Sequence, residues 1–484
     1  MKSSFKRIVM LLLLVTTLLL TVACTKTSYI STYTDEEGNI QSVVVTDDDT
    51  FGGGGKKKTT VRIYTFNNPA ANEKYLKAIK EDFNVKYPNI KIELQTSTGS
   101  FYTNLLSDFS AGTQADLFYM EPGEIYPFLQ EGYLEPLDSY FNKSTLISQD
   151  DVWEINKLAY RYDATTDTFG GESGQTYALL KDWTTDAMLY YNRSLFTEEQ
   201  LAIIERDEDN DGIFDPMSYE EFETLCQELL IKEGNTIKQY SFLPGLAEAK
   251  VLSQFLTNAG LSWFDKTTYR STLSTPEVKE IIEYYYRILS LNNVNNVGST
   301  HMPLFEQGKV AMIMGGLYNI NENNLDKFGD NLGVAYPPVK DKTKDVKPFT
   351  TGCVALAMSS SSRVKDAAWK FIEWYMDYFG KVDAQACSNF TAKKDYAKYI
   401  IDPKFNDNVT RLRIGKIFYA SLSKAIIIER NKYCSQASFE SAELAYAGEY
   451  LNGDFTLNQF IEAVEGRINA VVELNREWYE GKGI

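Results

Sequence analysis

The feature that most constrains the fold of this chain is a regular alternation of strand-like and helix-like segments from residue 59 onward. Residues 61–66 are rich in β-branched and aromatic side chains, and 90–94 and 115–120 are two further strand candidates. Helical patterns over 71–86 and 102–111 separate these strands. Strands that alternate with helices in this way predict an α/β fold with a parallel sheet.

Polar residues follow the first and third of these strands. Asn67 and Asn68 come directly after the first strand, and Glu121 comes directly after the third. Ligands of open α/β sheets bind at the carboxyl ends of the strands, so these side chains are candidate ligand-binding residues. The alternative for the two asparagines is to cap the helix that follows. No glycine-rich phosphate-binding sequence follows the first strand, which disfavours a nucleotide ligand.

The N-terminal end of the chain has the pattern of a secretory signal. Lys2, Lys6 and Arg7 precede an apolar run over 8–20, and small residues follow this run before Cys24. The run is too short for a comfortable membrane span. Its end resembles a bacterial lipobox, which implies cleavage before Cys24, lipidation of that cysteine and a place on the extracellular face of the cell membrane. The alternative is an ordinary secretory signal with an incidental cysteine.

The predicted signal peptide covers residues 1–23. The segment that follows it is rich in threonine, serine and aspartate and ends in glycines and lysines. Residues 24–58 show no helical period and carry too little apolar surface to fold. A flexible, lipid-anchored linker is therefore expected, which would hold the rest of the chain near a membrane surface. A strand over 40–45 is the alternative.

The composition disfavours several classes of function. The net charge of −17 argues against nucleic acid as a partner. His301 is the single histidine and has no catalytic sequence around it, which disfavours Ser-His-Asp and Cys-His catalysis. The sequence has no CxxC pair and no histidine cluster, so neither a zinc site nor a thiol redox motif is expected. Whether disulfides join any of Cys226, Cys353, Cys387 and Cys434 is left open.

Five blocks of sequence stand in an order that is typical of one known family. They are GTQADLFYM at 112–120, WTTDAMLYYN at 183–192, FEQGKVAM at 305–312 followed by GGLY, TGCVALAM at 351–358, and AAWKFI at 367–372. In this order they resemble the carbohydrate-type extracellular solute-binding proteins of bacterial ABC importers, a maltose-binding-protein-like family. Ala115 stands where this family more often has proline.

The resemblance implies two α/β lobes joined by strand crossovers, with a ligand cleft between the lobes and a helical C-terminal part. Lobe one takes residues 59–183 and 347–378, and lobe two takes 184–346 and 379–484. Closure of the lobes around the ligand would be a hinge motion. The resemblance further implies a monomeric binding protein, not an enzyme. It would capture a carbohydrate, expected to be an oligosaccharide, and pass it to the transmembrane subunits of an ABC permease.

A sugar presents pairs of hydroxyl groups and apolar C–H faces, so its site needs a few placed polar groups together with aromatic rings. From this chemistry and the resemblance, the candidate ligand-binding residues are Asn67, Asn68, Glu121, Trp183, Tyr318, Thr351 and Gly352. Packing at the hinge is the alternative for Trp183. Tyr119, Tyr240 and Trp263 are further candidates for ring stacking, but core packing is the favoured interpretation of each.

A second pattern combines acidic residues at alternate positions with a glycine. Over 207–215 the sequence DEDNDGIFD resembles the calcium loop D-x-D-x-D-G. The expected Ca²⁺ ligands are Asp207, Asp209, Asp211, the carbonyl of Ile213, Asp215 and Glu220. Glu221 is an alternative to Glu220, because Ser218 stands where an EF-hand has its glutamate. The alternative to calcium is a solvated acidic turn that caps a helix.

Two other classes of function remain as alternatives. A secreted glycan-degrading enzyme would use a pair of carboxylates, and the many acidic residues supply candidates. However, the chain shows no recognisable barrel repeat. A surface lipoprotein such as an adhesin or a chaperone would need no ligand cleft. The ordered family motifs account for more of the chain than either alternative does.

Overall fold

The computed structural model describes residues 29–34, 40–45, 58–97, 99–294, 301–319, 322–350, 353–386 and 389–482. The chain forms two compact units, Met1–Lys57 and Lys58–Ile484. In the first unit, β1 (Tyr29–Thr34) pairs in antiparallel fashion with β2 (Ile40–Val45). The alternative of a strand over 40–45 is therefore present, and the flexible linker over 24–58 stays a prediction elsewhere. The predicted signal peptide and Cys24 lie outside the described residues.

A six-stranded sheet forms the core of the first lobe, in the order β17-β9-β16-β5-β3-β4. Its strands are β3 (Thr59–Thr65), β4 (Ile90–Thr96), β5 (Leu117–Met120), β9 (Ala178–Trp183), β16 (Val354–Met358) and β17 (Phe390–Thr391). β3 runs parallel to β4 and β5, which confirms the parallel pairing predicted from the alternation. β16 is antiparallel to β5 and β9, so the complete sheet is mixed.

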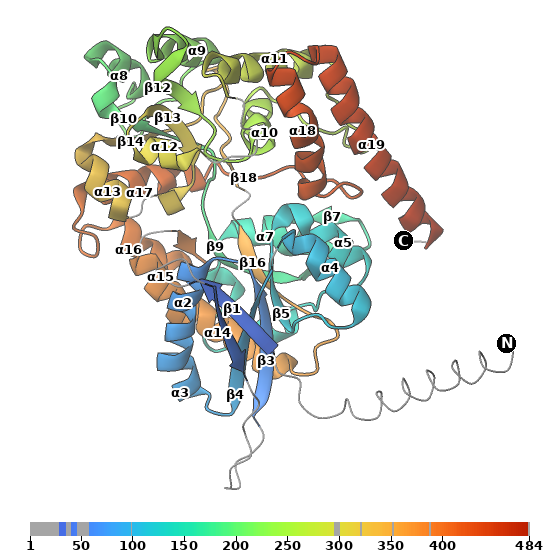
Figure 1. The fold of residues 1–484 in the computed structure, drawn as a ribbon. Helices are drawn as coiled ribbons and strands as arrows, with labels where there is room; N and C mark the ends of the chain where they lie inside the picture. The colour runs from blue at the N-terminus through green and yellow to red at the C-terminus, as the bar shows by residue number, and fades with distance from the viewer. Residues whose placement is uncertain are drawn as a thin grey trace, which may run out of the picture. The chain divides into compact units, whose positions relative to one another are not determined.

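Helices cover this sheet along its length. They include α2 (Pro69–Ala78), α3 (Asn84–Lys86), α4 (Phe101–Ala111), α5 (Ile125–Gln130), α6 (Asp138–Phe141), α7 (Glu154–Tyr160), α14 (Lys365–Trp374) and α15 (Gly380–Gln385). Figure 1 shows α2 and α14 along one side of the sheet and α4 and α5 along the other. All four residues of β5 are buried, because helices cover this central strand. A small three-stranded sheet of β6 (Arg161–Asp163), β7 (Thr168–Phe169) and β8 (Gln175–Thr176) lies beside α7.

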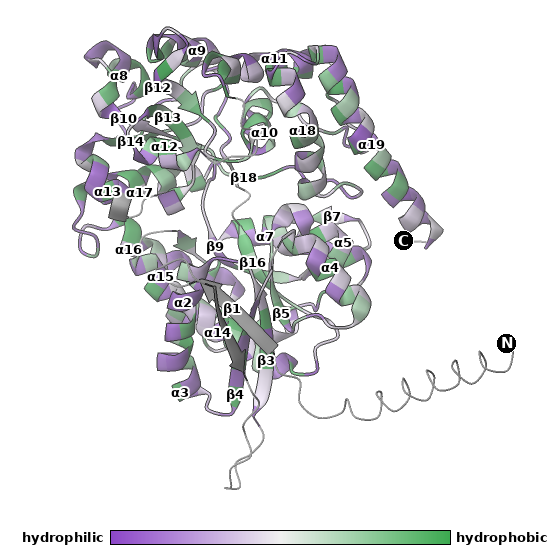
Figure 2. Cartoon of the chain, viewed as in Figure 1, coloured by the Kyte–Doolittle hydropathy of each residue, from purple (hydrophilic) through white to green (hydrophobic). Residues whose placement is uncertain are grey.

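A five-stranded sheet forms the core of the second lobe, in the order β11-β12-β13-β10-β14. Its strands are β10 (Met188–Asn192), β11 (Ile231–Glu233), β12 (Thr236–Leu243), β13 (Val310–Gly315) and β14 (Leu332–Ala335). Its helices are α8 (Glu198–Ile204), α9 (Tyr219–Glu228), α10 (Glu248–Asn258), α11 (Pro276–Leu291), α12 (Met302–Glu306) and α13 (Glu322–Phe328). Every residue of β13 is buried, and Figure 2 shows the hydrophobic colouring of such central strands.

The chain crosses between the two sheets more than once. β9 and β10 belong to different sheets, so the block at 183–192 is two strands joined by a crossing at 184–187. A return crossing leads from β14 to β16, and β15 (Phe349–Thr350) on this path pairs with β18 (Ile426–Ile427). β17 pairs with β9 in the first sheet, although the sequence boundaries assign 379–484 to lobe two.

The last part of the chain is helical, as the family resemblance implies. It contains α16 (Lys398–Ile401), α17 (Val409–Leu422), α18 (Gln436–Leu451) and α19 (Leu457–Gly481). α18 packs against α19, α10 and α11, and it also contacts the turn Pro122–Glu124 of the first lobe. Figure 2 shows hydrophilic and hydrophobic residues mixed along α19, whose apolar residues pack inward. Among the helices of the described residues, none has both the length and the apolar character needed to cross a membrane.

Candidate ligand-binding site

The candidate site lies where strand ends of both sheets meet the crossing between them. Glu121 follows the end of β5, Asp186 lies in the crossing from β9 to β10, and Tyr318 follows β13. Tyr318 is 39% exposed, whereas Asp186 is buried. The hydroxyl end of Tyr318 is buried even though the residue as a whole is not, and this burial raises its pKa; the charges of Asp186 and Glu121 raise it further. Groups from both lobes therefore face one another at this point.

The ammonium group of Lys250 lies among acids in the same place. Lys250 belongs to the first turn of α10, and its Nζ lies 3.9 Å from Oε1 of Glu440 on α18. Burial alone would lower the pKa of Lys250, but the carboxylates around it, Glu440 before Glu121, raise it above its ordinary value. This cation thus contacts Glu440 and lies near acids of the first lobe.

The carboxyl group of Glu121 is a strongly perturbed acid of this cluster. Burial raises its pKa to about 7, against the opposing charge of Lys250. The backbone N–H of Glu121 donates to the hydroxyl of Tyr102 over 2.9 Å, which fixes the turn after β5. Near neutral pH the carboxyl group exists in both forms, so it can accept a hydrogen bond from a ligand hydroxyl or donate one to it.

The turn Pro122–Glu124 joins the first lobe to the start of α18. A Cβ on Gly123 would lie 2.4 Å from Oε1 of Gln436, so only glycine permits this close approach. Oε1 of Glu124 accepts a 2.6 Å hydrogen bond from the backbone N–H of Ala437, a donor in the first turn of the helix. Nε2 of Gln436 donates to Oε1 of Glu440 over 2.6 Å. This contact between the lobes therefore also positions the acid that faces Lys250.

The structure places the other predicted ligand-binding residues differently. Oδ1 of Asn68 accepts a 3.2 Å hydrogen bond from the N–H of Ala71, so Asn68 caps α2, and Asn67 beside it is exposed. Trp183 is 2% exposed and packs edge-on against Trp153, with ring centroids 5.4 Å apart. This position is the packing role that the sequence leaves as its alternative. Thr351 and Gly352 lie outside the described residues.

The further ring candidates and the cysteines take structural positions. Tyr119 and Trp263 are buried, and Nε1 of Trp263 donates to Oγ of Ser253 over 2.7 Å. Tyr240 is half-buried within β12. Cys226 and Cys434 are buried free thiols.

The acidic loop at 207–215 brings three carboxylates together. One oxygen from each of Asp207, Asp209 and Asp211 lies within 4.8 Å of the others. Gly212 has a φ of +82°, and its N–H donates to Oδ2 of Asp207 over 3.0 Å, which closes the turn. Oδ2 of Asp215 accepts a 2.8 Å hydrogen bond from the N–H of Glu208. The side-chain atoms that these aspartates offer to a cation are all oxygens, which suits a hard cation such as Ca²⁺.

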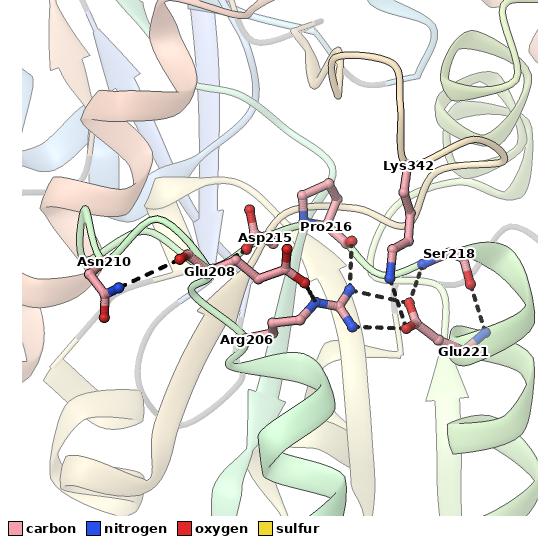
Figure 3. Close-up of polar contacts among 8 residues, drawn as sticks. All are labelled: Arg206, Glu208, Asn210, Asp215, Pro216, Ser218, Glu221 and Lys342. Atoms are coloured by element: carbon pink, nitrogen blue, oxygen red, sulfur yellow. Dashed lines mark hydrogen bonds and ion pairs between the residues drawn. The ribbon is translucent and has the colours of Figure 1, made fainter.

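A network of ion pairs joins Arg206, which directly precedes the loop, to Glu221 on α9 and to Lys342 (Figure 3). Oε1 of Glu221 lies 2.8 Å from Nη1 of Arg206 and 3.0 Å from Nζ of Lys342. Although burial opposes the shift, these cations and the backbone N–H of Ser218 lower the pKa of Glu221 to about 2. Ser218 and Glu221 also form the capping box of α9. Glu221 is thus occupied by Arg206 and Lys342, which leaves Glu220 as the expected last ligand.

The comparison with known proteins decides the family. The family model of bacterial extracellular solute-binding proteins matches residues 68–377. The chain belongs to this family. This confirms the family predicted from the ordered motifs.

Individual relatives of this solute-binding protein bind sugars. A maltotriose-binding protein from Pyrococcus abyssi is 24% identical over 318 residues, which is 65% of this chain but only 62% of that protein. An ABC substrate-binding protein from Listeria monocytogenes in complex with cycloalternan superposes with a TM-score of 0.66 at 18% identity, over 86% of this chain and 100% of that one. A maltodextrin-binding domain from Bdellovibrio bacteriovorus bound to maltotriose gives 0.65 at 14% identity, with coverage of 86% and 100%. These structures confirm the two-lobe α/β fold.

Sequence reasoning did not propose three residues of this candidate site. Asp186 had a local signal, since it is the one charged residue in the block 183–192, which spans two strands. Lys250 had a weaker local signal, because it lies in the first turn of α10, the helix that follows the end of β12. Glu440 had none, because it reaches the site only through the packing of α18 against α10.

Proposed function

We propose that this solute-binding protein captures a carbohydrate, expected to be an oligosaccharide, between its two lobes and delivers it to the transmembrane subunits of an ABC permease. The observation that carries the proposal is the meeting of Glu121, Asp186, Lys250 and Tyr318 at the crossing between the sheets. A few charged groups beside an exposed aromatic ring suit a ligand with hydroxyl pairs and apolar faces. The sugars named for the relatives support this ligand class.

Binding at this position would favour the closed arrangement of the lobes. The acids and the lysine come from segments of both lobes, so a ligand that contacts them bridges both. A ligand shifts such an equilibrium only by its difference in affinity for the two states. Since groups from both lobes converge only when the lobes are close, the closed state binds more tightly. The protein is expected to act as a monomer and to leave its ligand chemically unchanged.

Thermal unfolding with a panel of sugars tests the proposed function. We expect at least one maltooligosaccharide or mannooligosaccharide to raise the melting temperature, because a ligand at about 100 times its Kd stabilises by about 2.7 kcal/mol. Chromatography of the same mixtures after overnight incubation checks the enzyme alternative. Shorter sugar products would contradict the binding role, and a flat melting temperature across sugars and polyols would contradict carbohydrate as the ligand.

We also propose that lipidation of Cys24 anchors the protein to the extracellular face of the cell membrane. The support is the sequence pattern around this cysteine together with the membership of an extracellular family. Such an anchor would keep the binding lobes near the permease. The mass of the mature N-terminal peptide measures this, and a peptide without diacylglycerol on Cys24 would contradict it.

For the acidic loop we propose a structural Ca²⁺ ion held by Asp207, Asp209, Asp211, Asp215, the carbonyl of Ile213 and Glu220. The support is the group of three carboxylates within 4.8 Å. Such an ion would offset the repulsion between these acids and brace the start of α9 in the second lobe. It would take no part in contacting the sugar.

Chelation is expected to destabilise the second lobe. A chelator should lower the melting temperature of the wild type, because an ion that binds only the folded state stabilises it. Asp209→Asn should lower the starting value and abolish the chelator effect. Glu208→Gln serves as the matched control, since Glu208 lies in the same loop but outside the proposed ligand set. A wild-type melting temperature that stays the same when chelator is added would contradict the proposal.

A further inference from the structure

A large groove runs between the first lobe and the two long C-terminal helices. One wall comes from α4 and α5, and the other comes from α18 and α19. Its volume is about 970 Å³, close to the upper end of the roughly 300–1,000 Å³ that is typical of ligand pockets. Figure 1 shows the end of α19 extending beyond α18 toward the side of α4 and α5.

An exposed tryptophan stands in this groove and is held in place. Trp478 on α19 is 58% exposed. Its Nε1 lies 3.4 Å from Oε1 of Glu131, which follows α5 in the first lobe. Nζ of Lys482 lies 2.7 Å from the same oxygen and 4.4 Å from the centroid of the indole ring. The ring is therefore oriented by two charged neighbours while most of its surface stays open to a ligand. Leu474, one turn earlier on α19, also lines the groove and is 68% exposed, so two neighbouring apolar side chains are open here.

The rest of the wall that carries Trp478 also offers polar groups. Ser435, Ser438 and Ser441 line it from the start of α18, at intervals of three that place them along one face of the helix. Nδ2 of Asn475 donates to the carbonyl of Tyr433 over 2.7 Å, which fixes another amide at the wall. Hydroxyl and amide groups beside an open indole ring match the hydroxyls and C–H faces of a sugar.

The groove begins beside the candidate site. Tyr102 and Glu124 both line it. The hydroxyl of Tyr102 accepts the hydrogen bond from the backbone of Glu121, so this ring lies between the acid cluster and the groove. Burial raises the pKa of Glu124 to about 8, and the charge of Glu121 contributes to the shift, which also places the two carboxyls near each other. The groove therefore borders the segment 121–124, and a chain molecule that spans this segment would contact both the acid cluster and the groove.

We propose that the groove is a second carbohydrate-binding subsite, which takes the distal sugar units of an oligosaccharide whose other end lies at Glu121. This inference rests on the proposed function and adds a preference for chain length. Trp478 would stack on a distal sugar unit, and the serines of α18 would bind its hydroxyls. Short sugars would fill only the site at Glu121, so they would gain nothing from the groove.

Calorimetric titration of a length series tests the subsite. Maltooligosaccharides and mannooligosaccharides from one to six units are titrated into the full chain, its Trp478→Ala and Trp478→Phe variants, and Leu444→Ala as a control. Leu444 is an exposed apolar residue of α18 that does not line the groove. We expect Trp478→Ala to weaken binding of the longer members by about fivefold or more and to leave the disaccharide within twofold. Trp478→Phe should retain most of the affinity, and Leu444→Ala should match the wild type at every length.

Each other outcome overturns a defined part of the account. An equal loss at all lengths, or no loss at any length, would overturn the subsite while leaving carbohydrate binding intact. A wild type that binds no member of either series would overturn the proposed function together with the subsite. Melting temperatures of the variants separate a lost contact from a lost fold, and a variant that melts like the wild type has lost only the contact.

Discussion

Replacing Lys250 by methionine is expected to abolish ligand binding and to lower the free energy of unfolding by about 3 kcal/mol. The methionine keeps the length of the side chain but removes the cation that faces Glu440, Glu121 and Asp186. Breaking a buried pair leaves its partners uncompensated, which is more costly than the pair was favourable. The side chains of Lys250 and Glu440 keep 22% and 20% exposure, so the lower end of the usual range applies. Denaturant unfolding and calorimetric titration measure the two effects.

A double-variant cycle shows whether the cost comes from the stranded acids. Glu440→Gln in the background of Lys250→Met should recover part of the lost stability, because one of the uncompensated charges is gone. The exposed Glu198→Gln in the same background should recover nothing. A Lys250→Met protein that is as stable as the wild type and still binds its ligand would contradict the assignment of this lysine.

The contact between the lobes is expected to weaken as the pH rises. Burial raises the pKa of Glu124 to about 8 and the pKa of Glu121 to about 7, both above the ordinary value of 4.5. The folded state therefore binds more protons than the unfolded state, so this contribution to stability is complete below about pH 4.5 and is lost as the pH rises through 7 and 8. Melting temperatures from pH 5 to pH 9 should fall at the alkaline end through this contribution.

Glu124→Gln isolates the larger part of this effect. The amide keeps an oxygen that can accept from the N–H of Ala437 but carries no charge at any pH. The variant should therefore melt above the wild type at pH 9 and close to it at pH 5. Glu198→Gln on the surface should follow the wild type throughout. If the melting temperatures of the wild type and of Glu124→Gln change in parallel from pH 5 to pH 9, the raised pKa of the buried Glu124 carboxyl is contradicted.

The first lobe was predictable from sequence where its pattern is local. The order of β3, α2, β4, α4 and β5 follows from apolar periodicity and turn residues within short windows, and the structure has these elements in that order. The break between β9 and β10 was not predictable in the same way. The crossing at 184–187 has the polar sequence TTDA but is fully buried, so its polarity alone does not show that the chain changes sheets here rather than forming a surface turn.

The candidate site was predictable only where topology alone positions a residue. Glu121 follows the end of a central strand, and Tyr318 follows β13 next to a pair of glycines, so their positions at strand ends could be predicted, while their contact with a ligand stays a prediction. Trp183 satisfied the same rule, yet Trp153 and Phe390 pack around it from segments far away in the sequence. Lys250 and Glu440 meet through the packing of α10 against α18, which no local pattern reveals.

The central claim is that a carbohydrate binds at the cluster between the lobes, and calorimetric titration of Asp186→Asn tests it most directly. Asp186 lies in the crossing itself, and the change to asparagine keeps its shape while removing its charge. With the tightest-binding oligosaccharide of the panel, we expect the affinity to fall by about tenfold or more. The Glu198→Gln control should keep the wild-type value. An Asp186→Asn protein that is folded and binds the same sugar with unchanged affinity would contradict the account.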